Sequence, residues 1–370
     1  NNKLLTEKEL KAIVKDVFKT EQRPEKKITL DFEHNLSMSA LKYLQQSLRT
    51  FYEVILNVSK QLYPNEYHQI TPQILRLHTW VGYDVDGRGD IFWSDSFSKR
   101  LRVKIDQLNL YGNSIKNIIK SCKNQNLRKE LNQINLVVSD SITHNTEALK
   151  KFEEIGFVDN LYSIKQVSNY LHKNKSKLLT NTNPIVKKLS NLIENFKKEK
   201  IDNSLIDGII ILKIEIINFG LGLGRTQLRL NANQLNNAIS KEIDLKGDPN
   251  DPSNKLTYLN IISKMIDNVK PVKINFGSIF EENMNARRYF MLTKQILKYI
   301  DENQSIRFLI AECDYPLTVM TALYFSKLFG VEQKIDISPL FETERGLEIG
   351  HDVIRILLKN SNFKKYILGR

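Results

Sequence analysis

The sequence predicts an α/β protein that is predominantly helical, built on a partial (β/α)8-type barrel with many additional helices. Three observations lead to this prediction. Apolar residues recur at helical spacing through most of the first half of the chain. After residue 254, short apolar strands alternate with amphipathic helices. Each strand is followed by polar residues, and α/β enzymes usually place their sites at strand ends.

The first half predicts a series of long helices. Between residues 36 and 62, apolar side chains such as Leu41, Leu44 and Leu48 recur at a spacing that lines one helix face. Pro64 and Pro72 then interrupt the chain. Further helices are expected at about 95–123, 127–155, 162–172, 184–199 and 203–217.

The second half predicts a parallel βαβ unit. Residues 306–311 form a short apolar strand, 317–328 an amphipathic helix and 334–341 a second strand, and such crossovers are nearly always right-handed. Other expected elements are strands at 75–80, 225–230 and 271–276, and a helix at 286–300.

Loop signals divide the chain into three segments. Gly247–Asn254 holds two prolines and a glycine, which exclude regular structure. We therefore expect an N-terminal helical segment (1–70), a segment of barrel strands with a large helical insertion (71–246) and a segment of further βα units (247–370).

Composition indicates a globular intracellular protein. A hydrophobic content of 41% supports a buried core. Cys122 and Cys313 are the only cysteines, with no Cys/His cluster, which argues against a disulfide scaffold or a zinc site. No run of about 18 apolar residues and no basic-then-apolar N-terminus occurs, so we expect a cytoplasmic protein without a membrane partner.

The net charge of +13 raises the question of a nucleic-acid partner. The lysines, however, occur in scattered pairs such as Lys150–Lys151 and Lys187–Lys188, separated by acids and asparagines, and no basic stripe interleaved with aromatics is present. A solvated basic surface without nucleic acid is the favoured interpretation. A basic helical nucleic-acid binder remains a third, weaker alternative, which a salt-dependent affinity for DNA or RNA would reveal.

The segment from Trp80 to Asp90 has the densest concentration of site chemistry. An apolar run ends there in glycines, carboxylates and an arginine, and Gly82 and Gly87 allow backbone angles that turn polar side chains toward one place. The segment resembles the W-x-G-G-D-R-D-G-N signature of phosphoenolpyruvate carboxylases. By this match the candidate residues are Trp80, Asp84 and Asp86, and Arg88 is a candidate as a substitute for the family's arginine.

Two further segments resemble the same family. Residues 338–343 match its P-L-F-E-T element, and residues 219–229 look like its F-G-L-x-L-x-R-x-D-I-R-Q segment. The resemblance runs from about Asp31 onward. It implies that Glu342 is a ligand of Mg²⁺ or Mn²⁺, and that Arg229 holds the substrate phosphate. It also implies conversion of phosphoenolpyruvate and bicarbonate to oxaloacetate and phosphate, by a homo-tetramer in the full-length protein.

The implied chemistry suits these residue types. Both substrates are anions, and the reaction passes through phosphoryl transfer and an enolate. Arginine makes bidentate hydrogen bonds to phosphate and stays protonated, so Arg229 and Arg88 are the catalytic candidates. Trp80, Asp84, Asp86 and Arg229 are the substrate-binding candidates, with Trp80 excluding water from the enolate. The carboxylate of Glu342 suits a hard divalent ion.

Departures from the family pattern leave alternatives open. An arginine is lost at Val85 and regained at Arg88, while Gln227 and Leu230 replace an aspartate and a glutamine, so we expect no carboxylate support for Arg229. The family's T-A-H-P-T-E histidine, its G-Y-S-D-S aspartate and its glycine-arginine loop are missing from this sequence. We therefore expect an internal fragment, inactive by itself and ending before the second metal-ligand strand. A non-catalytic relative acting as a helical binding or regulatory protein is the alternative.

Each candidate residue also has an ordinary structural interpretation. Glu342 could be an acid placed by the dipole of the following helix, Arg229 could pair with a surface acid, and Trp80 could be a core residue. The spacing of Asp84 and Asp86 also suggests a calcium loop, but the other ligands of such a loop are absent. Glu312 and Asp314 follow a strand and are second-rank site candidates.

Overall fold

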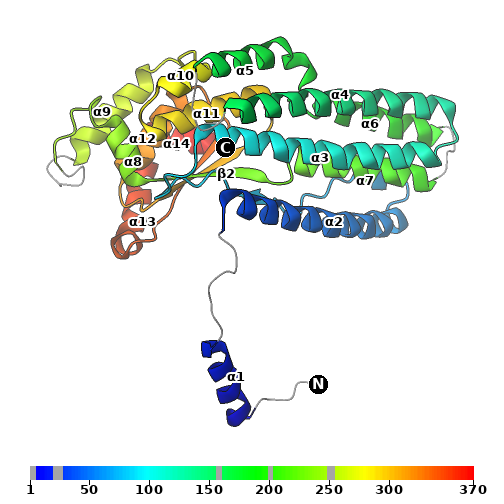
Figure 1. Ribbon diagram of the computed structural model, residues 1–370, viewed down its shortest axis with the longest axis horizontal. Coiled ribbons are helices and arrows are strands. Elements are labelled where there is room, and N and C mark those ends of the chain that lie inside the picture. The colour runs from blue at the N-terminus through cyan, green and yellow to red at the C-terminus, as the bar shows by residue number, and fades with distance from the viewer. Residues whose placement is uncertain (1–5, 20–27, 156–160, 199–202, 248–254) are drawn as a thin grey trace.

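The computed structural model describes residues 6–19, 28–155, 161–198, 203–247 and 255–370. The chain is mostly helical, with long helices extending to one side of a small sheet and shorter helices packed around it (Figure 1). The α-helices are α1 (Glu7–Lys19), α2 (Leu30–Leu62), α3 (Trp93–Ser121), α4 (Gln125–Ile155), α5 (Leu161–Lys173), α6 (Asn183–Lys198), α7 (Asn203–Phe219), α8 (Ala232–Ile239), α9 (Lys255–Asn268), α10 (Phe276–Glu281), α11 (Asn285–Tyr299), α12 (Pro316–Leu328), α13 (Glu344–Lys359) and α14 (Ser361–Leu368).

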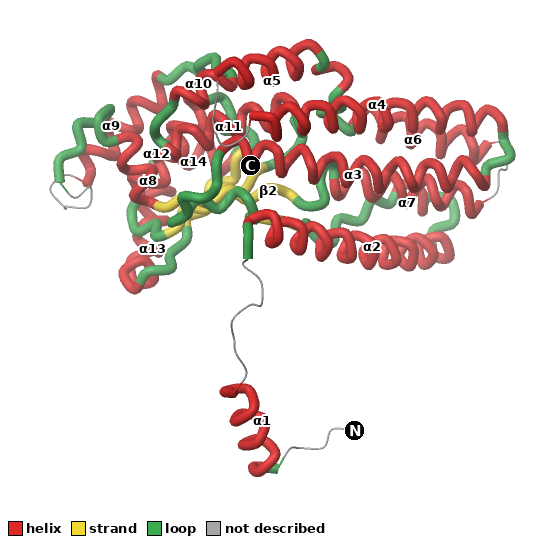
Figure 2. The backbone as a smooth tube through the Cα atoms, in the orientation of Figure 1, coloured by secondary structure: helices red, strands yellow, loops and turns green. Residues whose placement is uncertain are grey.

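The sheet contains strands β1 (His78–Thr79), β2 (Arg225–Asn231), β3 (Ile306–Ala311) and β4 (Ile335–Pro339) in that spatial order. Figure 2 shows the strands in yellow, at the inner end of the long helices. All neighbouring strands are parallel. The parallel βαβ unit expected after residue 305 is therefore confirmed. Parallel strands end at one edge, so the residues after β1, β2, β3 and β4 lie near one another.

One face of the sheet is buried and the other is only half covered. Side chains alternate along β2, so Leu228 and Leu230 enter the main core, whereas Gln227 and Arg229 point to the opposite side and remain partly accessible. Phe308 of β3 packs against Phe290 of α11 on the buried side, with the two rings tilted and their centroids 4.7 Å apart. The accessible face therefore presents the polar side chains of β2.

The long helices form a second core away from the sheet. Apolar side chains of α3, α4, α6 and α7 fill it, among them Leu108, Leu131, Leu189 and Ile209. The five helices expected between residues 95 and 217 are all present, with ends shifted by at most three residues. The helix expected from residue 36 begins at Leu30, because the Thr29 hydroxyl accepts the Phe32 N–H at 3.2 Å and caps it there.

Two expectations about strands were wrong in detail. Residues 271–275 form no strand, and α10 begins at Phe276 instead, because the Asn275 side chain accepts the Ser278 N–H at 3.0 Å. Pro271 also lacks the N–H that a central strand requires. The strand expected from Leu75 to Trp80 pairs only at His78 and Thr79.

The larger architectural expectations have mixed outcomes. The described strands form a four-stranded parallel sheet, so an α/β fold is confirmed while the barrel remains a prediction. Residues 248–254 of the expected linker lie outside the described residues. The division into three segments also remains a prediction.

A buried histidine in α2, His34, should make the fold less stable at low pH. His34 is 3% exposed, and its Nε2 has no partner among the described residues. Burial, with a further contribution from Lys99, lowers the pKa of His34 to about 4, from an ordinary 6.5. Below pH 6.5 the His34 imidazole binds a proton in the unfolded chain but stays neutral in the folded chain. The free energy of unfolding therefore decreases as the pH falls from 6.5 toward 4.

We expect His34→Phe to remove roughly 3 kcal/mol of this loss in the free energy of unfolding. Urea unfolding at pH 7 and pH 4 measures the effect. The exposed His351 is the matched control, and His351→Phe should leave the pH dependence unchanged. An equal pH dependence in wild type and His34→Phe would show that His34 is not responsible.

Candidate functional site

The carboxyl end of β2 is joined to the turn that follows β1. The Arg229 N–H donates to the Tyr83 carbonyl at 3.1 Å, and the Val85 N–H donates to the Arg229 carbonyl at 3.1 Å. Tyr83 and Val85 are buried in the main core. Because side chains alternate along an extended segment, Asp84 and Asp86 point the other way, toward the side chain of Arg229.

Glycines shape this turn as the sequence indicated. Gly82 has φ +88° and Gly87 has φ +65°, which are left-handed conformations that glycine adopts without strain. The Trp80 carbonyl accepts the N–H groups of Tyr83 and Asp84 at 2.8 and 3.0 Å, which closes the turn. The turn thus carries the chain from Trp80 to the two aspartates within a few residues.

Glu342 arrives at the same edge from β4. Its Oε1 accepts the Glu312 N–H at 3.2 Å. Glu312 directly follows β3 and has φ +53°, a left-handed backbone that is uncommon outside glycine. Backbone strain of this kind concentrates at functional sites. The loop after β3 is thereby shaped to hold the carboxylate of Glu342.

The first turn of α13 is capped by the residue after Glu342. The Thr343 hydroxyl accepts the Gly346 N–H at 2.8 Å and also contacts the Asp314 carboxylate at 2.8 Å. A Cβ at Gly346 would lie 2.6 Å from Asp314 Oδ1, so this close arrangement requires glycine. Since Thr343 supplies the cap, Glu342 is free of the capping role.

Three carboxylates surround the guanidinium of Arg229. Nη2 lies 3.3 Å from a carboxylate oxygen of Asp86 and 3.3 Å from one of Glu342, and Nη1 lies 3.9 Å from Asp84. Burial raises the pKa of the Asp84 carboxyl, and the nearby Arg229 opposes this shift. The expectation that Arg229 lacks carboxylate support was wrong, because the support comes from the turn and from β4 rather than from Gln227.

The cluster around Arg229 can bind further ligands of either charge. Three carboxylates around one guanidinium leave a formal charge of two negative units when all are ionised, which favours an additional cation. Arg229 Nε has no partner among the described residues, and donors of this type bind phosphate oxygens. The cluster therefore combines an anion-binding donor with cation-binding oxygens.

Oxygen ligands of this kind fit a magnesium ion. Mg²⁺ is commonly bound by one or two carboxylates together with water and substrate phosphate. Glu342 and Asp86 approach the same nitrogen of Arg229 and so lie close to each other. No set of three or more His, Cys, Asp and Glu side chains suitable for a metal occurs in the described residues, so an all-protein cage is not formed there.

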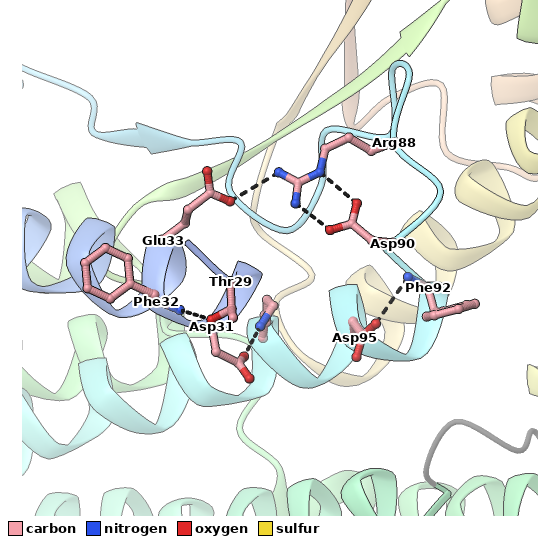
Figure 3. Close-up of polar contacts among 9 residues, drawn as sticks. Thr29, Asp31, Phe32, Glu33, Arg88, Asp90, Phe92 and Asp95 are labelled. Carbon is pink, nitrogen blue, oxygen red and sulfur yellow. Dashed lines mark hydrogen bonds and ion pairs between the residues drawn. The ribbon is translucent and has the colours of Figure 1, made fainter. Parts of the chain in front are cut away.

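Arg88 is engaged elsewhere in the structure. Its Nε and Nη2 donate to the two carboxylate oxygens of Asp90 at 2.9 and 2.7 Å, and its Nη1 donates to Glu33 at 3.1 Å (Figure 3). These hydrogen bonds, that of Asp90 first, raise the pKa of Arg88. The guanidinium thus ties the turn to the start of α2, and its catalytic role remains a prediction.

Trp80 directly follows β1 and is 55% exposed. This exposure does not agree with the alternative that Trp80 is a core residue. Ion pairs bring Arg229 together with Asp84, Asp86 and Glu342. Trp80 lies at the same edge of the sheet and takes no part in these ion pairs.

Sequence reasoning ranked two contributors low and missed a third. Glu312 and Asp314 were second-rank candidates, yet they position Glu342 and Thr343. The Gln234 side chain donates to the Val85 carbonyl at 3.1 Å and holds the turn against α8. Nothing in the local sequence of α8 marks Gln234 as a partner of residue 85.

Comparison with known proteins identifies the family. None of the helices in the described residues has the length and apolar composition needed to cross a membrane. No curated protein matches the chain in a direct comparison. The family pattern described as phosphoenolpyruvate carboxylase matches residues 2–370. This match, which covers nearly the whole chain, shows that the chain belongs to the phosphoenolpyruvate carboxylase family.

Proposed function

We propose that this chain supplies the phosphate-binding part of an active site that carboxylates phosphoenolpyruvate with bicarbonate, forming oxaloacetate and phosphate. The observation that carries the proposal is the meeting of Arg229 with Glu342 at 3.3 Å, from segments 113 residues apart in sequence. Family membership supports the reaction type. The contact supports the roles assigned to the two side chains.

In this proposal Arg229 binds the phosphate group. Its free Nε and its Nη atoms, once released from the carboxylates, offer parallel donors to phosphate oxygens. Asp84 and Asp86 hold the guanidinium in the substrate-free state and orient it. Glu312 fixes the carboxylate of Glu342 through its backbone N–H. Little reorganisation is then needed when substrate arrives.

Glu342 and Asp86 would hold the divalent ion, Mg²⁺ or Mn²⁺. When bound, the ion supplies Lewis-acid stabilisation of the negative charge on substrate oxygens. The carboxylates around Arg229 leave an excess of negative charge, which favours entry of the ion. Trp80 presents a large apolar surface beside the sheet edge, which limits water near a reactive enolate.

The direct test is bicarbonate-dependent phosphate release from phosphoenolpyruvate, measured on the protein encoded by the complete reading frame. We expect release that requires bicarbonate and Mg²⁺ or Mn²⁺, with oxaloacetate formed in equal amount. The complete protein is proposed to be a cytoplasmic homo-tetramer. Phosphate release that is independent of bicarbonate would contradict the proposed reaction.

The exposure of Trp80 permits a clean test of water exclusion. Trp80→Ala should change the free energy of unfolding by less than about 0.5 kcal/mol, because the side chain is half exposed. We expect the variant to release more pyruvate relative to oxaloacetate, since an unshielded enolate is protonated by water. Enzymatic assays of both products measure the ratio. Trp93, which is buried, is not a suitable control, so Phe92→Ala serves as the exposed aromatic control.

One observation favours the second candidate, a non-catalytic member of the family. Gln227 and Leu230 replace polar residues of the family segment on either side of Arg229. A non-catalytic protein would retain phosphoenolpyruvate binding through Arg229 without turning it over. Equilibrium binding of phosphoenolpyruvate without any bicarbonate-dependent phosphate release would identify this case.

A further inference from the structure

A polar cavity lies at the opposite edge of the sheet, where β2 and β3 begin. Its volume is about 250 Å³. Arg225, the first residue of β2, and Gln304, two residues before β3, both line it. Arg229 is four residues further along β2. At about 3.3 Å per residue, the cavity lies roughly 13 Å from the site described above.

Gln304 is buried and unsatisfied. Its side chain is 5% exposed, and neither its amide oxygen nor its amide nitrogen has a partner among the described residues. Buried amide groups are nearly always hydrogen-bonded, because leaving one unpaired costs about 1–3 kcal/mol. A cavity lined by such a side chain is therefore built for a polar occupant.

Arg100 supplies a buried positive charge in the same cavity. It is 2% exposed, and it donates to the Gly224 carbonyl at 2.9 Å and to Asp301 at 3.4 Å. Its Nε has no partner among the described residues. A Cβ at Gly222 would lie 2.3 Å from the Arg100 guanidinium, so a glycine is required where this side chain passes. The chain thus makes room for Arg100 beside the cavity.

Positive charge exceeds negative charge around the cavity. Arg100 and Arg225 are opposed by Asp301 alone among the acidic side chains that line it, and Arg225 makes no ion pair within 4 Å in the described residues. The nearby Lys104 does not add a full positive charge at neutral pH, because burial lowers its pKa to about 7. A buried excess of positive charge is costly unless an anion offsets it.

Two helix ends also border the cavity. Residues at the start of α6 contribute partial positive charge, and the last turn of α7 contributes partial negative charge. These contributions oppose each other. The guanidinium groups of Arg100 and Arg225 therefore make the electrostatic potential in the cavity positive.

We propose that this cavity binds one small anion, a phosphate or a carboxylate of similar size, between Arg225, Arg100 and Gln304. The anion accepts hydrogen bonds from the Arg225 guanidinium, from Arg100 Nε and from the Gln304 amide nitrogen. It thereby satisfies Arg100 Nε and the Gln304 amide nitrogen, which are otherwise buried without partners among the described residues. The site is separate from the cluster around Arg229 and does not depend on the proposed carboxylation.

Calorimetric titration with inorganic phosphate tests the proposal, at constant ionic strength set with sodium chloride. The chain should carry Arg229→Gln throughout, so that phosphate binding at the other edge is removed. We expect one saturable site per chain, weakened at least tenfold by Arg225→Gln and at least tenfold by Gln304→Leu. The exposed Arg355 provides the matched control, and Arg355→Gln should leave the affinity unchanged.

A parallel titration with acetate shows whether the cavity prefers a phosphate or a carboxylate. Tighter binding of phosphate assigns the site to phosphate compounds, and tighter binding of acetate assigns it to carboxylates. Gln304→Leu removes no charge, so it remains informative if Arg225→Gln fails to fold. The proposal is overturned if no saturable site exists for either anion, or if binding is unchanged in Gln304→Leu.

Discussion

Replacing Arg229 by glutamine in the complete protein should lower kcat/KM for phosphoenolpyruvate by about 10³-fold. Two charge-assisted hydrogen bonds to phosphate contribute roughly 4 kcal/mol together, and about 1.4 kcal/mol corresponds to a factor of ten. Glutamine keeps one donor but not the planar fork or the charge. Initial rates of bicarbonate-dependent phosphate release over a range of phosphoenolpyruvate concentrations measure the effect.

The position of Arg229 in the structure implies that its substitution should affect activity rather than folding. It is 31% exposed at the end of β2, and its ion pairs with Asp86 and Glu342 are only partly buried. Such pairs contribute little to stability, so Arg229→Gln should fold normally by circular dichroism. Arg355→Gln, which removes the same charge from the surface of α13, should keep full activity. An Arg229→Gln enzyme with unchanged kcat/KM would rule out the assigned phosphate contact.

Replacing Glu342 by glutamine should reduce kcat by at least about 10²-fold, the usual loss when a charge-stabilising group is removed from an active site. The amide oxygen of glutamine can still accept the Glu312 N–H, so the loop after β3 keeps its shape. The lost carboxylate should also raise the concentration of Mn²⁺ needed for half-maximal binding. Electron paramagnetic resonance of free Mn²⁺ measures this binding independently of turnover.

The neighbouring acid Glu344 is the control for Glu342. It is exposed in the first turn of α13, one residue beyond the Thr343 cap. Glu344→Gln removes an equal charge from nearly the same place and should leave both kcat and Mn²⁺ binding unchanged. If Glu342→Gln and Glu344→Gln behaved alike, the metal-ligand role of Glu342 would be untenable.

Local patterns predicted much of the fold. Helical periodicity placed the long helices, because each buries one apolar stripe. The apolar runs at 306–311 and 334–341, on either side of an amphipathic helix, predicted the parallel strands that the structure shows as β3 and β4. The prediction of a strand at 271–276 was wrong because a short apolar run does not distinguish a strand from a loop leading into a helix. The side chain of Asn275 decided that outcome, and capping is a local interaction that periodicity does not register.

Motifs supplied the candidate site residues but not the partners of these side chains. Arg229 and Glu342 were named from their segments, and the structure brings them into contact. The pairing of residues 83–85 with β2 joins segments about 145 residues apart, and no local pattern encodes it. The same holds for the pairing of Arg88 with Glu33, and for the left-handed backbone of Glu312.

The double variant Arg229→Gln/Glu342→Gln tests most directly whether the two residues serve one site. Side chains that act as a unit lose their effect together, so their losses in kcat/KM are far from additive. We predict that the loss of kcat/KM for phosphoenolpyruvate in the double variant is little larger than the loss in the less active of the two single variants. A loss equal to the product of the two single losses would show that Arg229 and Glu342 act independently, and would contradict the shared site.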